Sequence, residues 1–165
     1  MIKKKICMLG AFAVGKTSLV QRYVHSIFSD KYHTTIGVNI EKTRVCAGDT
    51  DVDLIIWDLY GEDEFQKVRL SYLKGASGCI YVVDGTRKAT LATALNLKET
   101  VHNALGETPF ILVINKSDLK NQWEIDMSTL EDLRQKGTII IETSAKTGEE
   151  VKEVFQLLTK KMMDK

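Results

Sequence analysis

The chain has 165 residues, 44% of them hydrophobic and 27% charged, with a formal net charge of +1. This balance excludes an intrinsically disordered protein, and it gives no support for nucleic acid as a partner. We expect residues 1–165 to form a single domain with a sizeable core, since no apolar run is long enough to span a bilayer. The three cysteines are scattered, so we expect reduced thiols, with Cys7 and Cys79 buried, and a cytoplasmic location.

Six apolar runs predict β-strands, and several are continuous β-branched runs typical of strands covered on both faces. These runs are residues 2–9, 38–46, 51–57, 79–83, 110–114 and 138–141. The second and third runs are joined around Gly48 and Asp49, which predicts a hairpin and hence one antiparallel edge strand.

Helical patterns lie between these strands, at residues 18–24, 90–105, 128–136 and 149–163. For the third pattern we expect Ser128 as N-cap, with Glu131 completing a capping box. Six strands alternating with about five helices predict a doubly wound α/β fold with a mostly parallel six-stranded sheet.

Residues 10–17 fit the pattern G-x-x-x-x-G-K-[ST] between the first strand and the first helix. A glycine-rich loop that opens a helix directs backbone N–H groups and the positive helix end at one point, which suits a polyphosphate. We expect Lys16 to reach the β- and γ-phosphates and Thr17 to bind Mg²⁺. The expected phosphate-binding residues are Gly10, Ala13, Val14, Gly15, Lys16, Thr17 and Ser18. The alternative is a glycine-containing turn with an unrelated lysine.

Two further motifs follow predicted strands. Asp58 and Gly61 form D-x-x-G, in which the carboxylate can hold Mg²⁺ and the glycine N–H can approach a γ-phosphate. Asn115, Lys116 and Asp118 form N-K-x-D. A carboxylate can accept from both N1–H and the N2 amine of guanine, and leaving it buried and unpaired is costly, so Asp118 should select guanine. Taken alone, either motif can be a simple turn.

Other positions complete this expectation. Asn115 can tie its loop to the phosphate loop, and the stem of Lys116 can lie over the base. After the last strand, a backbone N–H can meet guanine O6, which singles out Ser144, Ala145 and Lys146. Between the first helix and the second strand, Tyr32 and Thr35 lie in a loop in which Thr35 can bind Mg²⁺ and the γ-phosphate. Phe28 either stacks on the base or belongs to the core.

In this order, the motifs resemble those of small GTPases of the Ras superfamily, and most of all its Rab branch. The resemblance implies a switch that binds GTP or GDP with Mg²⁺, acts as a monomer, and signals to protein effectors and an exchange factor through two switch loops. It also implies that Lys16 stabilises charge in catalysis, that Thr17, Thr35 and Asp58 hold the metal, and that Gly61 contacts the γ-phosphate. Of the aromatic trio typical of Rab effector surfaces, Trp57 and Tyr72 are present and Ile40 replaces the third.

The chain departs from that family at several positions. Phe12 stands where a small residue is usual and should crowd the γ-phosphate region and an arginine finger. Glu62 replaces the glutamine that orients the attacking water, and its charge faces a developing negative charge. We therefore expect slow hydrolysis. The chain ends in Lys165 without a terminal cysteine, so we expect no direct lipid anchor on it; membrane association would need a missing tail or a partner.

Two alternatives remain open. One is a nucleotide-bound interaction module with little or no GTP hydrolysis. The other is a P-loop kinase of a small molecule, which would leave Asn115, Lys116 and Asp118 unexplained and lacks an arginine-rich lid. Arg87 and Arg134 are isolated in the sequence, and we expect them to be solvated surface residues.

Overall fold

The computed structural model describes residues 2–28, 38–59 and 70–164. Its centre is a six-stranded sheet with the order β2-β3-β1-β4-β5-β6. The strands are β1 (Ile2–Gly10), β2 (Val38–Ala47), β3 (Thr50–Leu59), β4 (Ala76–Asp84), β5 (Phe110–Asn115) and β6 (Ile140–Thr143). All neighbouring pairs are parallel except β2 and β3, which confirms the predicted mixed sheet with one antiparallel edge.

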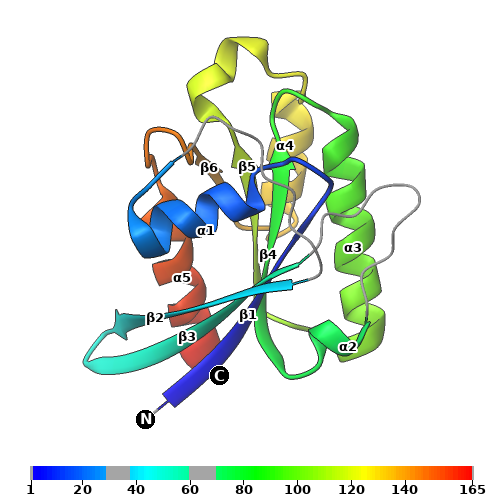
Figure 1. The fold of residues 1–165 in the computed structure, drawn as a ribbon. Helices are drawn as coiled ribbons and strands as arrows, with labels where there is room; N and C mark the ends of the chain where they lie inside the picture. The colour runs from blue at the N-terminus through cyan, green and yellow to red at the C-terminus, as the bar shows by residue number, and fades with distance from the viewer. Residues whose placement is uncertain (1, 29–37, 60–69, 165) are drawn as a thin grey trace.

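Helices cover both faces of this sheet (Figure 1). The α-helices in the described residues are α1 (Lys16–His25), α2 (Leu70–Leu73), α3 (Ala89–Leu105), α4 (Met127–Gln135) and α5 (Val151–Met163). A 3-10 helix, Ser117–Gln122, follows β5 and was not predicted. The α/β fold inferred from the alternating apolar runs is therefore confirmed.

Two core clusters divide the interior, one on each face of the sheet. The first packs α1 and α5 against the sheet, and the second packs α2, α3 and α4 against the opposite face. Strand β1 contributes to both, since Ile6 and Met8 belong to the first cluster and Cys7 and Leu9 to the second. This alternation explains why the central strands are continuous apolar runs. Cys7 and Cys79 are buried, as predicted.

The start of α4 differs from the prediction. Its N-cap is Asp126, whose carboxylate Oδ1 accepts from the backbone N–H of Ser128 at 3.1 Å. Ser128 thus lies inside the helix, and the predicted capping box with Glu131 was wrong. Aspartate and serine are equally good N-caps, so residue type alone could not choose between these two positions.

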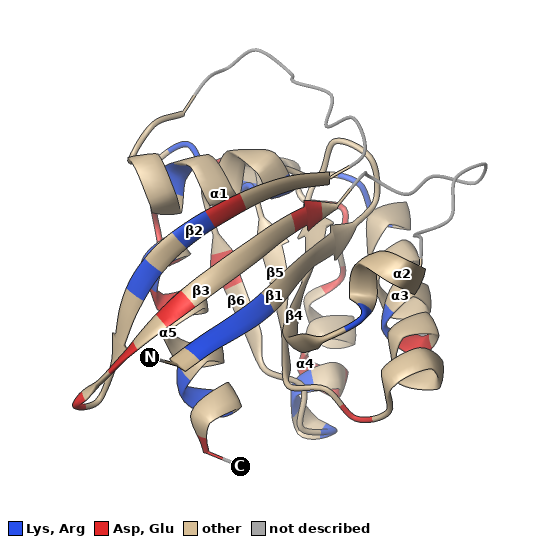
Figure 2. Cartoon of the chain, turned by 60° about the horizontal axis from the view of Figure 1, so that its bottom comes forward, with Lys and Arg blue, Asp and Glu red and all other residues tan. Residues whose placement is uncertain are grey.

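On the β2–β3–β1 part of the sheet, β1 carries basic residues, β3 acidic residues and β2 residues of both signs (Figure 2). The carboxylate of Asp53 on β3 lies 3.1 Å from Nε of Arg44 and 3.8 Å from Nζ of Lys42, both on β2. Cross-strand pairs of this kind favour the antiparallel register that joins the two strands.

The topology places five strand ends at one edge. The parallel strands β1, β3, β4, β5 and β6 end at Gly10, Leu59, Asp84, Asn115 and Thr143. Strands β2 and β3 lie on one side of β1, and β4, β5 and β6 lie on the other. The direction in which successive strands are added to the sheet therefore reverses at β1. Ligands of open α/β sheets bind outside the carboxyl ends of strands at such a point.

Candidate functional site

The phosphate loop, residues 10–17, connects β1 to α1. Ala13 and Gly15 have left-handed backbones, with φ angles of 62° and 103°. Position 15 requires glycine, because a Cβ on Gly15 would lie 2.3 Å from Nδ2 of Asn115. Gly15 caps α1 without a side-chain hydrogen bond, and the first turn holds no acidic residue. The first N–H groups of α1 are therefore available to an anion.

Lys16 lies inside this loop with only 6% of its surface exposed. Its Nζ donates to the carbonyl oxygens of Gly10 and Ala11, each at 3.2 Å. Burial lowers the pKa of Lys16 to about 8, although Asp58 opposes the shift and Arg87 adds to it. The amine is thus held by carbonyls at the mouth of the loop, and an anionic group there would favour its charged form.

Thr17 and Asp58 meet beside the loop. The Thr17 hydroxyl donates to Oδ2 of Asp58 at 2.6 Å, whereas Oδ1 of the fully buried Asp58 has no hydrogen-bond partner among the described residues. Burial raises the pKa of Asp58, with the Thr17 hydrogen bond and Lys16 acting against it. A buried carboxylate oxygen that lacks a partner, next to a hydroxyl, fits a hard divalent cation such as Mg²⁺.

Asn115, at the end of β5, connects the phosphate loop to the last strand. Its Nδ2 donates to the carbonyl of Val14 at 3.0 Å. Its Oδ1 accepts from Oγ1 of Thr143 at 3.2 Å and from the backbone N–H of Ala145 at 3.3 Å. Because Asn115 is 2% exposed and has hydrogen bonds at both its amide nitrogen and its oxygen, it fixes three segments that are far apart in the sequence.

Asp118 and Ser144 form the other end of the site. Asp118 is exposed. Its Oδ1 accepts from Oγ of the buried Ser144 at 2.8 Å, which fixes the carboxylate beside the loop after β6. The site therefore brings the N-K-x-D motif and residues 144–146 together, as the sequence suggested, around an accessible carboxylate.

Arg22 supports the loop after β6 and was missed by the sequence analysis. Its Nε donates to the carbonyl of Ala145 at 2.8 Å, and its Nη2 donates to the carbonyl of Lys146. These contacts join α1 to a segment more than a hundred residues away, which no local pattern predicts. The carbonyls of Ala145 and Lys146 therefore face Arg22 of α1.

Arg87 is exposed, as expected, but it also has partners within the protein. Its Nε donates to Oδ2 of Asp84 at 2.9 Å and its Nη2 to the carbonyl of Phe12 at 2.7 Å. Arg134 also has partners, because its guanidinium lies within 3.9 Å of Glu131 and 3.7 Å of Glu142. Each arginine pairs with an acidic residue three positions earlier in the chain, and only its second partner is supplied by the fold.

The remaining predicted site residues differ in what the structure says of them. Phe12 is 40% exposed at the phosphate loop. Phe28 is half-buried and packs against the first core cluster, which favours the core interpretation over stacking on a base. Ser18 lies in the first turn of α1. Tyr32, Thr35, Gly61 and Glu62 lie outside the described residues.

A separate apolar surface lies on β2, β3 and α2. Ile40, which is 49% exposed, pairs with Trp57 across the β2–β3 ladder. The rings of Trp57 and Tyr72 are 6.1 Å apart, and Nζ of Lys5 lies 3.6 Å from the Trp57 ring centroid. The structure thus groups the three positions singled out for effector contact.

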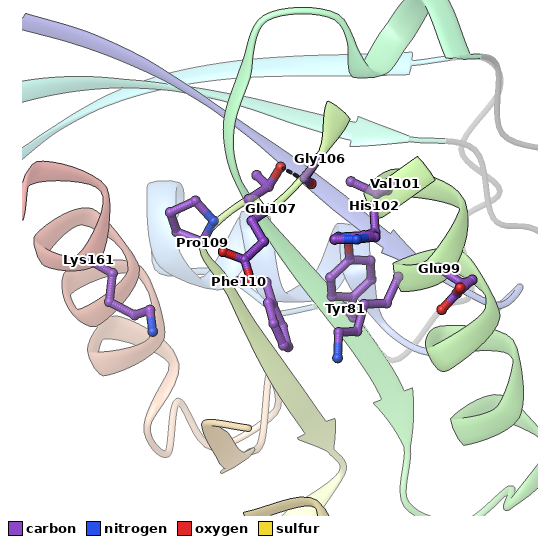
Figure 3. A pocket seen from close by; sticks show the side chains of 11 residues that line it. Tyr81, Glu99, Val101, His102, Gly106, Glu107, Pro109, Phe110 and Lys161 are labelled. Carbon is purple, nitrogen blue, oxygen red and sulfur yellow. Dashed lines mark hydrogen bonds between the residues drawn. The ribbon is translucent and has the colours of Figure 1, made fainter. Parts of the chain in front are cut away.

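A pocket of about 580 Å³ lies at the end of the sheet opposite to the phosphate loop (Figure 3). It is lined by residues of α3, by Pro109 and Phe110 at the start of β5, and by Lys161 of α5. Since Asn115 ends the same strand that Phe110 begins, this pocket and the phosphate loop lie at opposite strand ends. The pocket is therefore separate from the candidate nucleotide site.

Within the described residues, no helix is long and apolar enough to cross a membrane. A comparison with protein families matches the Ras family over residues 5–164, nearly the whole chain. The match spans the phosphate loop, the Thr17–Asp58 pair and the base-side loops, by which we mean residues 115–118 and 144–146. The chain therefore belongs to the Ras family of small GTPases, whose members are guanine-nucleotide-binding switches.

Proposed function

We propose that this chain is a Rab-like switch that binds GTP or GDP with Mg²⁺ and hydrolyses GTP slowly. The observation that carries the metal and nucleotide part is the buried Oδ1 of Asp58, which has no hydrogen-bond partner among the described residues and lies beside the Thr17 hydroxyl and Lys16. In this proposal Thr17, Asp58 and Thr35 hold the metal, and a bound cation polarises the phosphate oxygens. Lys16 then binds the β- and γ-phosphates.

The base side follows the same logic. Asp118 accepts from the N1–H and N2 amine of guanine, supported by the hydrogen bond that Ser144 donates to its Oδ1. A backbone N–H among residues 144–146 meets guanine O6. A small-molecule kinase would not need this carboxylate, so the arrangement favours the switch.

Slow hydrolysis rests on two residues. Phe12 is exposed at the phosphate loop, where its benzyl group would occupy the space that an activator's arginine finger needs. Glu62 would repel the charge that develops on the transferring phosphoryl group. Gly61 would contact the γ-phosphate through its N–H. Effectors and an exchange factor would read the switch loops and the surface of Ile40, Trp57 and Tyr72.

Domain organisation and location belong to the same proposal. We take residues 1–165 as one GTP-binding domain, because both core clusters are built on the same sheet. We also propose that this domain acts as a monomer. We place the protein in the cytoplasm, with membrane association through a partner or a further segment of chain.

Single-turnover hydrolysis of bound GTP tests this function. We would compare the wild type with Phe12→Gly, Glu62→Gln and the double variant, and use Met127→Ala as a control at another exposed apolar residue, on α4. The double variant should hydrolyse about 10–100-fold faster, since a water-orienting donor is restored.

Three outcomes separate the alternatives. A faster double variant supports a catalytic site that these residues slow. If neither the wild type nor the double variant hydrolyses GTP, the result supports the nucleotide-bound interaction module. A wild-type rate equal to that of ordinary family members would contradict slow hydrolysis.

A further inference from the structure

Arg87 spans the space between the phosphate loop and a buried carboxylate. It lies between β4 and α3, and its side chain is 44% exposed. Nε donates to Oδ2 of Asp84 at 2.9 Å, and Nη2 of the same guanidinium donates to the carbonyl of Phe12 at 2.7 Å. One planar group thus holds the backbone of the phosphate loop, 75 residues away in the chain.

Asp84 is the centre of a larger network. It is 1% exposed, and its Oδ1 accepts from the N–H and the hydroxyl of Thr86 at 2.9 and 2.7 Å. Its Oδ2 accepts from Arg87 and from Nζ of Lys116 at 2.7 Å. Burial acts to raise the pKa of Asp84, but the hydrogen bonds from Lys116, Thr86 and Arg87 outweigh it and hold the pKa below its ordinary value. Asp84 is therefore an ionised anchor for both cations.

The second cation belongs to the base-side loop. Lys116 has a left-handed backbone, with φ of 74°, and its carbonyl accepts from Nε1 of Trp123 at 2.8 Å. The indole of Trp123 packs on Gly85, where a Cβ would lie 2.2 Å from a ring atom. Lys116 is thus fixed at its backbone by Trp123 and at its amine by Asp84.

We propose that Arg87 is a positioning residue that couples the phosphate loop to the N-K-x-D loop through Asp84 and so controls the rate of nucleotide release. This inference rests on the proposed guanine-nucleotide site. It adds a second connection to the one that Asn115 makes, since Asn115 holds Val14 and Arg87 holds Phe12. With both connections in place, neither loop can move away from the nucleotide independently.

The chemistry requires arginine at this position. A guanidinium has several donors in a fixed fork, so Nε and Nη2 can bind different acceptors at the same time. A lysine carries its donors on one atom at the end of a flexible stem, and it retains the charge without the fork. Replacing Arg87 with lysine therefore distinguishes a role in bridging two acceptors from an effect of positive charge alone.

The test measures release of a fluorescent GDP analogue from the full chain. We would compare the wild type, Arg87→Ala and Arg87→Lys, with Arg134→Ala as the matched control, because that arginine also has carboxylate partners but lies on α4. Release should be about tenfold faster in Arg87→Ala, as for loss of one hydrogen bond from a charged group. Arg87→Lys should behave like Arg87→Ala, and Arg134→Ala like the wild type.

Unfolding in urea completes the test. The inference predicts that Arg87→Ala unfolds at a urea concentration similar to that for Arg134→Ala although its release is faster. It is overturned if release in Arg87→Ala stays within about twofold of the wild type, if lysine restores wild-type release, or if faster release merely accompanies a matching loss of stability. A wild type that binds no GDP analogue would instead overturn the proposed function.

Discussion

The phosphate side and the base side of the site differ in how far the protein satisfies its own polar groups. On the phosphate side, burial lowers the pKa of Lys16 to about 8 and raises that of Asp58, and Oδ1 of Asp58 has no partner among the described residues. On the base side, Asn115 has partners for both its amide nitrogen and its oxygen, and Ser144 fixes Asp118. On the phosphate side, a bound nucleotide and metal should therefore reduce the free-energy cost of burying these charged groups. On the base side, the nucleotide should bind to groups that the protein already holds in place.

The largest expected effect is on nucleotide binding by Lys16. Lys16→Met should weaken GDP binding by about 10²–10⁴-fold, since two hydrogen bonds from a charged group, worth about 1.5–3 kcal/mol each, are lost. Titration of the nucleotide-free variant with GDP measures this. An affinity close to that of the wild type would show that the phosphates do not contact this amine.

The same variant gives a pH dependence with a definite sign. The pKa of Lys16 is about 8 in the folded protein against an ordinary value of 10.5, so the unfolded chain binds more protons between these values. The penalty of burying the charge is fully present below about pH 8 and disappears as pH rises toward 10.5. The unfolding free energy of nucleotide-free Lys16→Met, relative to the wild type, should therefore be about 3 kcal/mol higher at pH 7 than above pH 10.5.

Urea unfolding of both proteins at several pH values measures that difference, which should shrink steadily above pH 8. Because other titrating groups are common to both proteins, their contributions cancel. A difference that is constant with pH would mean that the Lys16 amine is not desolvated.

Asp118 tests whether the base side selects guanine. Removing its carboxylate with Asp118→Ala should weaken GDP binding by about 10–100-fold, because its bonds to the base are charge-assisted. Inosine diphosphate lacks the N2 amine, so the wild type should bind it more weakly than GDP. In Asp118→Ala that preference should vanish, and a preference that persists would assign the amine to another acceptor.

Asp58 tests the metal. Asp58→Asn keeps the shape of the side chain and removes its charge, so Mg²⁺ should bind about 10–100-fold more weakly in the nucleotide complex. In the wild type, chelation of Mg²⁺ should accelerate release of GDP, whereas in the variant it should have little further effect. Equal responses to chelation would remove Asp58 from the metal site.

Ser144 should give the smallest effect and tests how firmly the base side is prepared. Ser144→Ala removes the 2.8 Å hydrogen bond to Asp118 and the one that the hydroxyl accepts from the N–H of Thr147, but it keeps the backbone N–H groups proposed to contact guanine. GDP affinity should fall by about 3–10-fold, as for one hydrogen bond of about 0.5–1.5 kcal/mol. A loss as large as that in Asp118→Ala would indicate that the carboxylate is not held without this hydroxyl.

Sequence predicted the fold and the motif positions because both follow from local patterns. The continuous apolar run of β1 predicted a strand covered on both faces, and the glycines after it predicted the turn into α1. The contacts of Arg22 with the loop after β6 and of Arg87 with Phe12 were missed because only the fold brings these segments together. The Asp84–Arg87 pair is local in the sequence, but the two residues were not recognised as a pair. The wrong choice of Ser128 as N-cap has a different cause, since Asp126 and Ser128 are both acceptable N-caps and lie only two positions apart.

The most direct test of the whole account is the identity of the nucleotide carried by freshly purified protein. The protein would be denatured, and the released compounds would be separated by anion-exchange chromatography. The account predicts a guanine nucleotide in stoichiometric amount, with a substantial fraction still present as GTP because hydrolysis is slow. An adenine nucleotide, or no nucleotide together with failure to bind added GDP, would contradict it.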